Sequence, residues 1–306
     1  MDISVVLPCY NTAGTLELLS ERLIKVLERE SKSFEIIMIN DCSPSNDWEV
    51  IEKLALKDNR IKGINLSRNF GQYEAITAGL DRVKGDYVVL MDADLQDLPE
   101  ELPKLLRELE NGYDIVYGVR TNRKDTFFKK LASNLFHKFF NYFSGTNTDK
   151  GIATYAIYSK KVISTIISMR ERYREIYILS SWVGFKVAKV EIEHAKREIG
   201  ETSYDFKKGL DLALGAMFAY SDKPLKVSVL IGFVISLSSL VYGLYIFIRG
   251  ALGMENIPGW SSLIVSVWFL GGLILSFLGV IGIYIGKIFE EVKARPLYIV
   301  KDELNL

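Results

Sequence analysis

Residues 87–100 read YVVLMDADLQDLPE, and this stretch decides the fold. Its first five residues are apolar or aromatic, which predicts a buried strand. Asp92 and Asp94 follow that strand directly and flank a single alanine. A helix is expected over residues 99–109, because the first turn of a helix tolerates proline. The stretch therefore predicts a strand, an acidic turn and a helix in succession.

The same alternation extends over the N-terminal part of the chain. Strands alternating with helices of this length predict an α/β fold with a Rossmann-like, mainly parallel sheet covered on both faces. In such sheets ligands bind beyond the carboxyl ends of the strands. The other predicted strands are residues 3–7, 34–39, 61–66 and 114–117. Their carboxyl ends carry the polar residues Tyr10, Asn11, Asn40, Asp41, Arg68, Asn69 and Arg120.

The composition excludes several classes of protein. Lys plus Arg and Asp plus Glu both number 38, so the basic excess of a nucleic-acid-binding protein is absent and no nucleic-acid partner is expected. Cys9 and Cys42 are too few for a secreted disulfide scaffold, and we expect free thiols in a reducing compartment. With only two histidines in the sequence, a catalytic metal should be held by carboxylates.

Asp92 and Asp94 are the candidate metal ligands. Two carboxylates with little nitrogen or sulfur nearby suit Mg²⁺ or Mn²⁺, which accept oxygen ligands together with substrate phosphates. An Asp-x-Asp sequence alone is weak evidence, since most such pairs are solvated loop acids. Their position directly after a buried strand favours the metal site, and Gln96 and Asp97 extend the polar cluster.

Two further groups of strand-end residues have alternative interpretations. The carboxylate of Asp41 could accept the ring N–H of a nucleobase. Alternatively, the pair Asn40 and Asp41 could form an N-cap or an Asx-turn before the helix expected near residue 46. Arg68 and Arg120 suit phosphate groups at the rim of the sheet, or they could form surface ion pairs.

The C-terminal third predicts a membrane anchor. Residues 227–248 and 260–286 carry no charged residue, and at about 1.5 Å per residue each is long enough to cross a hydrocarbon core of roughly 30 Å. The positive-inside rule places the catalytic domain and both termini in the cytoplasm, on an inner, multi-pass membrane protein. The basic residues on the cytoplasmic side are Lys223, Lys226, Lys287, Lys293 and Arg295, against Arg249 alone on the other.

This pattern predicts three regions: a catalytic domain over 1–222, two transmembrane helices within 223–290 and a cytoplasmic tail over 291–306. Two amphipathic helices, about 126–143 and 206–220, are expected to lie at the membrane interface. A core helix is the alternative for the first, but its aromatic residues opposite lysines favour the headgroup boundary. The loop before the helix at 206–220 contains Arg197, Ser203 and Tyr204, which could bind a lipid phosphate at the membrane surface.

Six segments together resemble a known family. The chain is similar to the family-2 glycosyltransferases of the GT-A fold, and more closely to the branch that acts on polyisoprenyl phosphates. That branch includes dolichol-phosphate mannosyltransferases and bactoprenol-phosphate glucosyltransferases. The resemblance covers residues 5 to about 293. The segments are VVLPCYN (5–11), NDCSPSND (40–47), LSRNFGQYEAITAGL (66–80), VVLMDADLQDLPE (88–100), YGVR (117–120) and REIGETSYDFKKGLDLALGAMFAYSDKPLKV (197–227).

The resemblance implies roles for individual residues. Asp92 and Asp94 would hold the metal and the donor diphosphate, and Gln96 and Asp97 would face the sugar. The phosphates of the donor or of the lipid would bind Arg120, Arg197 and Ser203. The nucleotide-base pocket would be lined by Pro8, Tyr10, Asn11 and Asp41. From their positions at the strand ends, Asn40 and Arg68 are further candidates for binding the nucleotide sugar.

Two positions depart from the family pattern. Asn40 replaces the first aspartate usual before Asp41, which changes the contacts available to a base. Thr154 stands where the family usually has an acidic residue, often proposed as the catalytic base, and Asp149 is the fallback candidate. A phosphate monoester has a second pKa of roughly 6, so a lipid phosphate acceptor needs no proton removed at neutral pH.

The sequence therefore predicts transfer of a hexose from a nucleotide sugar, a UDP-sugar by family resemblance, to undecaprenyl phosphate with inversion. Membrane lipids are expected partners, and a homo-oligomer is left open. One alternative is transfer to a glycan or lipid hydroxyl, which would need a base. The other is a non-enzymatic membrane adaptor that binds nucleotide sugars.

Overall fold

The computed structural model describes all residues except 31, 121–151, 194, 196–216, 219 and 253–258, and it divides into two units. The first unit comprises residues 1–137, 146–203 and 295–306, and the second comprises residues 138–145 and 204–294. The predicted interface helix at 126–143 and most of the one at 206–220 lie outside the described residues.

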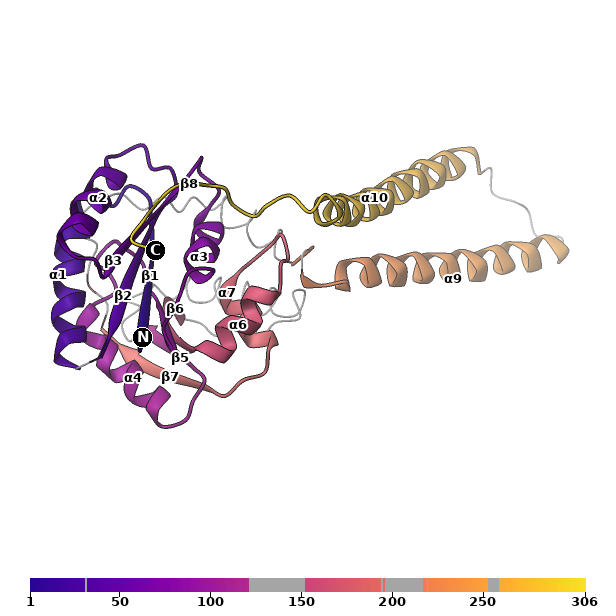
Figure 1. Ribbon diagram of the computed structural model, residues 1–306. Coiled ribbons are helices and arrows are strands. Elements are labelled where there is room, and N and C mark those ends of the chain that lie inside the picture. Colours follow the sequence, from indigo (N-terminus) through magenta and orange to yellow (C-terminus); the bar gives the residue numbers. More distant parts are fainter. Residues whose placement is uncertain (31, 121–151, 194, 196–216, 219, 253–258) are drawn as a thin grey trace. The chain divides into compact units, whose positions relative to one another are not determined.

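An eight-stranded sheet forms the centre of the first unit, in the order β7-β5-β6-β4-β1-β2-β3-β8 (Figure 1). Strands β1 to β5 and β7 share one direction, while β6 and β8 run antiparallel to their neighbours. The strands are β1 (Ile3–Cys9), β2 (Phe34–Asn40), β3 (Ile61–Leu66), β4 (Tyr87–Leu90), β5 (Ile115–Arg120), β6 (Ile152–Ser159), β7 (Val187–Ile192) and β8 (Val300–Leu304).

Helices connect these strands and cover both faces of the sheet, so the predicted α/β fold with a mainly parallel sheet is confirmed. The five strands predicted from the sequence are all present, with ends that differ by up to three residues. The helices of this unit are α1 (Ala13–Arg29), α2 (Asp47–Lys57), α3 (Gln72–Leu80), the short 3₁₀ helix η1 (Pro99–Glu101), α4 (Leu102–Glu110), α6 (Lys160–Ser168) and α7 (Ile176–Trp182).

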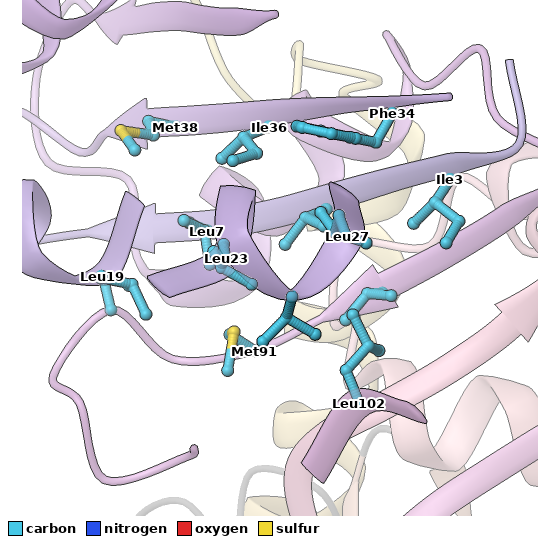
Figure 2. Packing of buried hydrophobic residues seen from close by; sticks show 14 of the residues in the cluster. Ile3, Leu7, Leu19, Leu23, Leu27, Phe34, Ile36, Met38, Met91 and Leu102 are labelled. Carbon is cyan, nitrogen blue, oxygen red and sulfur yellow. The ribbon is translucent and has the colours of Figure 1, made fainter. Parts of the chain in front are cut away.

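The main core lies between α1 and the sheet. Leu19, Leu23 and Leu27 recur at four-residue spacing on α1 and point toward the strands, as Figure 2 shows. Alternate residues of β1, among them Ile3 and Leu7, meet them from the sheet. Each such leucine contributes about 1.5–3 kcal/mol when fully buried, so this face is held mainly by apolar burial.

The opposite face of the sheet packs closely against α3. A Cβ added at Gly79 would lie 2.6 Å from Cγ1 of Val6 and 2.8 Å from Cδ1 of Ile39. Glycine at this position therefore lets α3 approach the strands, and that approach sets where the first turn of α3 meets the ligand end of the sheet.

A buried ionic cluster lies at the other end of the sheet. Glu35 is fully buried and accepts hydrogen bonds from Ser4 Oγ at 2.5 Å and from the N–H of Lys84 at 2.7 Å, and its second oxygen pairs with Lys62. Burial raises the pKa of this carboxyl, but the bonds from Lys62, Ser4 and Lys84 outweigh it and hold the pKa below its ordinary value.

The C-terminal residues return to the sheet as β8, where the sequence predicts only a tail. β8 pairs antiparallel with β3 at the edge of the sheet. Around it, Tyr298 donates from its hydroxyl to Asp81 at 2.6 Å, and Arg82 pairs with Glu303 at 2.8 Å. An otherwise open strand edge is therefore covered by the chain's own end.

The second unit contains two long apolar helices, α9 (Lys223–Ala251) and α10 (Trp260–Val292). They include both predicted spans, and by length and composition they could cross a membrane. A Cβ added at Gly232 of α9 would lie 3.5 Å from the ring of Phe277 on α10, and the Tyr284 hydroxyl donates to the carbonyl of Ser221 at 2.7 Å. The end of α10 therefore meets the start of α9, as in an antiparallel hairpin.

Candidate functional site

The carboxyl ends of β1 to β5 meet at one edge of the sheet, because these strands share a direction. Tyr10, Asp41, Arg68 and Asp92 follow β1, β2, β3 and β4, each within two residues of the strand end. Arg120 is the last residue of β5, and its backbone pairs with Ile192 of β7. The fold thus brings the predicted strand-end residues to a single rim.

The acidic turn after β4 is anchored from below by α1. The hydroxyl of Thr15 donates to the carbonyl oxygen of Ala93 at 2.6 Å, and both residues are buried. Within the turn, the N–H of Gln96 donates to Oδ1 of Asp94 at 3.1 Å, and Leu95 adopts a φ of 62°. A left-handed leucine is strained, so the surrounding contacts hold this turn in one conformation.

Asp92 is contacted from α3. The side-chain amide of Gln72 donates to Oδ1 of Asp92 at 2.8 Å, and the carboxylates of Asp92 and Asp94 are both half-buried. The sequence analysis did not predict a role for Gln72, although Gln72 lies in residues 66–80, one of the segments that carry the family resemblance. Its position as first residue of α3 is what brings it to the rim.

Asp41 fixes the loop that leads into α3. Its Oδ1 accepts the N–H of Phe70 at 2.7 Å and its Oδ2 accepts the N–H of Gly71 at 2.9 Å. Burial raises the pKa of the Asp41 carboxyl, while these two hydrogen bonds and the charge of Arg68 act in the opposite direction. The helix-cap interpretation of Asp41 is wrong, because these bonds go to the β3–α3 loop and α2 has no side-chain cap.

A second loop is held against the end of β1. The side-chain oxygen of Asn40 accepts the N–H of Ser43 at 3.1 Å, and the hydroxyl of Ser43 accepts the N–H of Asn11 at 2.9 Å. Asn11 and Cys42 have φ angles of 57° and 49°, so both residues at the rim are left-handed. Cys42 is an exposed free thiol, as expected, and Cys9 is a buried one.

Asp47 supports the same region from α2 and was missed by the sequence reasoning. It is fully buried, and its carboxylate accepts the N–H of Ala13 at 2.8 Å and that of Thr12 at 3.0 Å. It therefore satisfies the first amides of α1 from 34 and 35 residues away along the chain.

The remaining nucleotide candidates differ in exposure. Pro8 is half-buried within β1, whereas Tyr10 is 47% exposed. The guanidinium of Arg68 lies 4.1 Å from the centre of the Phe70 ring, within range of a cation–π contact. An aromatic side chain and a stacked guanidinium are groups that could contact a base and a phosphate.

Gln96 and Asp97 occupy different environments. Gln96 is half-buried, and its backbone carbonyl oxygen accepts the N–H of Ala195 at 3.0 Å. Asp97 is fully buried, and it lies close enough to the buried hydroxyl of Tyr155 to help raise the pKa of that phenol well above its ordinary value, after burial itself. Asp97 is therefore directed toward β6 and the interior.

Thr154 lies on β6 and is half-buried. β6 pairs antiparallel with β4, with Ala156 opposite Leu90. The fallback base Asp149 and the predicted lipid-phosphate residues Arg197, Ser203 and Tyr204 lie outside the described residues.

The donor set at the rim fits a divalent cation of the Mg²⁺ or Mn²⁺ type. Mg²⁺ in proteins is usually held by one or two carboxylates, with water and substrate phosphates completing its shell. Asp92 and Asp94 supply two carboxylates at the ligand end of the sheet. The side-chain amide of Gln72 orients Asp92, and the backbone N–H of Gln96 orients Asp94. The described residues contain no cluster of three or more His, Cys, Asp or Glu side chains suited to a metal.

Comparisons with known proteins identify the family of the chain. The sequence matches the family described as "Glycosyl transferase family 2" over residues 4–167. A Bacillus subtilis (strain 168) protein, the uncharacterized glycosyltransferase YkcC, is 37% identical over 304 residues, covering 99% of this chain and 94% of the relative. An undecaprenyl-phosphate 4-deoxy-4-formamido-L-arabinose transferase from Pectobacterium carotovorum is 34% identical over 314 residues, covering 99% and 94%.

Among solved structures, one is a glucosyl-3-phosphoglycerate synthase from Mycobacterium tuberculosis in complex with Mn²⁺, UDP and phosphoglyceric acid. It is 13% identical with a TM-score of 0.49, and the match covers 71% of this chain and 76% of that chain.

Proposed function

Because this chain belongs to glycosyl transferase family 2, we propose that it transfers a hexose from a UDP-sugar to undecaprenyl phosphate or a similar polyisoprenyl phosphate. The observation that carries the proposal is the pair Asp92 and Asp94, fixed at the ligand end of the sheet in a chain that also has two membrane-length helices. One relative of similar length is described as an undecaprenyl-phosphate sugar transferase, which supports the acceptor.

The nucleotide would lie along the ends of β1 to β3. Pro8, Tyr10 and Asn11 would line one side of the base, and Asn40 and Asp41 the other. Arg68 would bind a phosphate, because it follows β3 and its guanidinium stacks on Phe70 close to the strand end. Since both oxygens of Asp41 already accept backbone amides, its part would be to hold the base pocket in shape as well as to contact the base.

The diphosphate would lie near the acidic turn. Asp92 and Asp94 would hold Mg²⁺ or Mn²⁺, which when bound supplies positive charge to the departing diphosphate. The side chain of Gln72 and the backbone N–H of Gln96 keep the two carboxylates oriented before the substrate arrives. This avoids reorganisation during the reaction. Gln96 would face the sugar from this turn, and Asp97 would support the turn from the interior.

The acceptor phosphate would attack the anomeric carbon directly. An oxygen of the polyisoprenyl phosphate forms a bond to that carbon as the bond to the donor diphosphate breaks, and UDP leaves with the electron pair. Because the phosphate is mostly a dianion at neutral pH, positioning is sufficient and no base is needed. Thr154 carries no carboxylate, which is consistent with that mechanism.

Direct attack inverts the configuration at the anomeric carbon, so an α-linked donor gives a β-linked product. Asp149 would be needed as a base only if the acceptor were a hydroxyl group that must lose a proton. Arg120, Arg197, Ser203 and Tyr204 would bind the phosphate of the lipid or of the donor. The product is a polyisoprenyl-phosphate sugar, the form in which a sugar can be passed on for modification of a cell-surface glycan.

The membrane arrangement follows from charge. Lys223 and Lys226 precede the first uncharged span and Lys287 and Lys293 follow the second, whereas Arg249 alone lies near the connecting loop. The positive-inside rule then puts the catalytic domain and both termini in the cytoplasm. The catalytic domain and a lipid phosphate of the inner leaflet would then be on the same side of the membrane.

The proposal is tested by incubating the purified full-length protein with Mn²⁺, undecaprenyl phosphate and a panel of UDP- and GDP-sugars. Mass spectrometry of the lipid fraction should reveal one hexose added to the lipid phosphate from a UDP-sugar. Failure to modify the lipid with every donor, while the protein still binds UDP, would overturn the acceptor. A product made from GDP-sugars alone would overturn the donor.

A further inference from the structure

Three polar side chains form a row across the edge of the sheet. Asn40 of β2 is the register partner of Asn65 of β3, and Asn65 is in turn the register partner of Asp302 of β8. Asn40 and Asn65 are 4% and 6% exposed, so the row passes from the surface of β8 into the buried part of the sheet. Buried amides of this kind are costly unless they are hydrogen-bonded.

The hydrogen bonds in this row run in one direction. The Asn65 amide donates to Oδ2 of Asp302 at 2.9 Å, and the Asn40 amide donates to Oδ1 of Asn65 at 2.9 Å. The Asn40 oxygen is then left facing the N–H of Ser43, from which it accepts at 3.1 Å. An ionised carboxylate can only accept, so Asp302 sets the orientation of both asparagine amides.

The row ends at the rim of the candidate nucleotide pocket. Ser43 accepts the N–H of Asn11 through its hydroxyl at 2.9 Å, so the Asn40 oxygen and the Ser43 hydroxyl together connect the ends of β1 and β2. Asn11 and Cys42 both have left-handed backbones, a conformation that is disfavoured for a residue such as cysteine. A strained rim needs such contacts to persist.

We propose that Asp302 is a positioning residue for the nucleotide. Acting through Asn65 and Asn40, it holds the turn over residues 40–43 in the conformation that receives the base. The C-terminal strand then contributes to nucleotide affinity without touching the nucleotide. This inference rests on the proposed nucleotide pocket but not on the identity of the acceptor.

Glu303 provides a matched control. It is the next residue of β8 and forms an ion pair with Arg82 at 2.8 Å, away from the row of amides. A role limited to securing β8 at the sheet edge predicts that Asp302→Ala and Glu303→Gln behave alike. A positioning role predicts that only the change at Asp302 alters nucleotide binding.

The experiment compares Asp302→Ala, Asp302→Asn and Glu303→Gln in the full-length protein. We expect Asp302→Ala to weaken binding of UDP with Mn²⁺, and to raise the KM for the UDP-sugar, by about 10-fold, the loss of about 1.4 kcal/mol. The kcat and the KM for undecaprenyl phosphate should change by less than about twofold, since one positioning contact acts on the nucleotide alone. Asp302→Asn should recover most of the affinity, because its side-chain oxygen can accept the same hydrogen bond.

Unchanged UDP affinity in Asp302→Ala would overturn the inference, and so would an equal loss in Glu303→Gln. Two results exclude misfolding as the cause of weaker UDP binding. A misfolded Asp302→Ala variant would also lose affinity for undecaprenyl phosphate, and Asp302→Asn would then have no reason to recover UDP affinity. If the unaltered protein binds no nucleotide at all, it is the proposed function that fails, and the two failures are thereby distinguished.

Discussion

The side-chain amide of Gln72 and the carboxylate of Asp92 are hydrogen-bonded at 2.8 Å, which joins the first residue of α3 to the acidic turn after β4. The contact resembles the outer-shell bonds that orient metal-binding carboxylates in other proteins. Because α3 also packs tightly on the sheet through Gly79, the position of Gln72 is set by the core.

Replacing Gln72 by Ala should therefore weaken metal binding more than it lowers the maximal rate. Loss of such an outer-shell bond typically costs about 10–100-fold in metal affinity. The measurement is a Mn²⁺ titration of transferase activity, in which saturating metal should restore most of the kcat. An unaltered Mn²⁺ requirement would show that Gln72 does not orient Asp92.

Replacing Asp92 or Asp94 by Asn should lower kcat by about 100-fold or more, because a preorganised charge contact to the transition state is lost. Asp86→Asn is the control, since Asp86 lies just before the other end of β4 and is largely exposed. The control should keep its activity. Full activity in both the Asp92→Asn and the Asp94→Asn variant, measured in the same assay, would remove the proposed metal site.

The acceptor phosphate should govern the pH dependence of the reaction. With the phosphate dianion as nucleophile, kcat/KM for the lipid should rise with pH up to about 6 and remain level above it. Initial rates between pH 5 and 9 at fixed Mn²⁺ test this. A rate that continues to climb steeply above neutral pH would instead indicate a group that must lose its proton, and would favour a base at Asp149 or elsewhere.

Glu35 should make stability depend on pH in the acidic range. Its folded pKa is held below the ordinary value of 4.5, so the stabilisation is present above that value and is lost as pH falls through the lower, folded pKa. Glu35→Gln leaves Lys62 buried without its counter-charge and should cost about 3 kcal/mol or more. Thermal unfolding at pH 7 should show a clearly lowered Tm.

The comparison for Glu35 is Glu100→Gln, which breaks an ion pair with Arg22 whose partners are 50% and 28% exposed. Exposed pairs contribute less than about 1 kcal/mol, so its Tm should hardly change. Equal shifts in the two variants would mean that the buried cluster is not a special source of stability.

The sequence was informative where the signal is local. The strand of residues 87–91 and the acidic turn after it follow from an apolar run and two adjacent carboxylates, and both are where they were expected. The two apolar helices could also be predicted from the sequence, because uncharged apolar segments of 22 and 27 residues are typical of membrane-spanning helices.

Contacts between distant parts of the chain could not be predicted. Asp47 caps α1 from 34 residues away, and Asp302 reaches Asn65 across 237 residues of sequence. β8 was missed because VKDEL is short and mostly charged, and only the open edge of β3 makes it a strand. Such pairings depend on the assembled sheet, which no local pattern of residues specifies.

A matched pair of acceptors distinguishes a lipid phosphate acceptor from a lipid hydroxyl acceptor. Undecaprenyl phosphate and undecaprenol differ only in the phosphate and can be offered to the same full-length protein with Mn²⁺ and its UDP-sugar. We expect a β-linked sugar on undecaprenyl phosphate and none on undecaprenol. Transfer to undecaprenol at a comparable rate, or an α-linked product from an α-linked donor, would contradict this expectation.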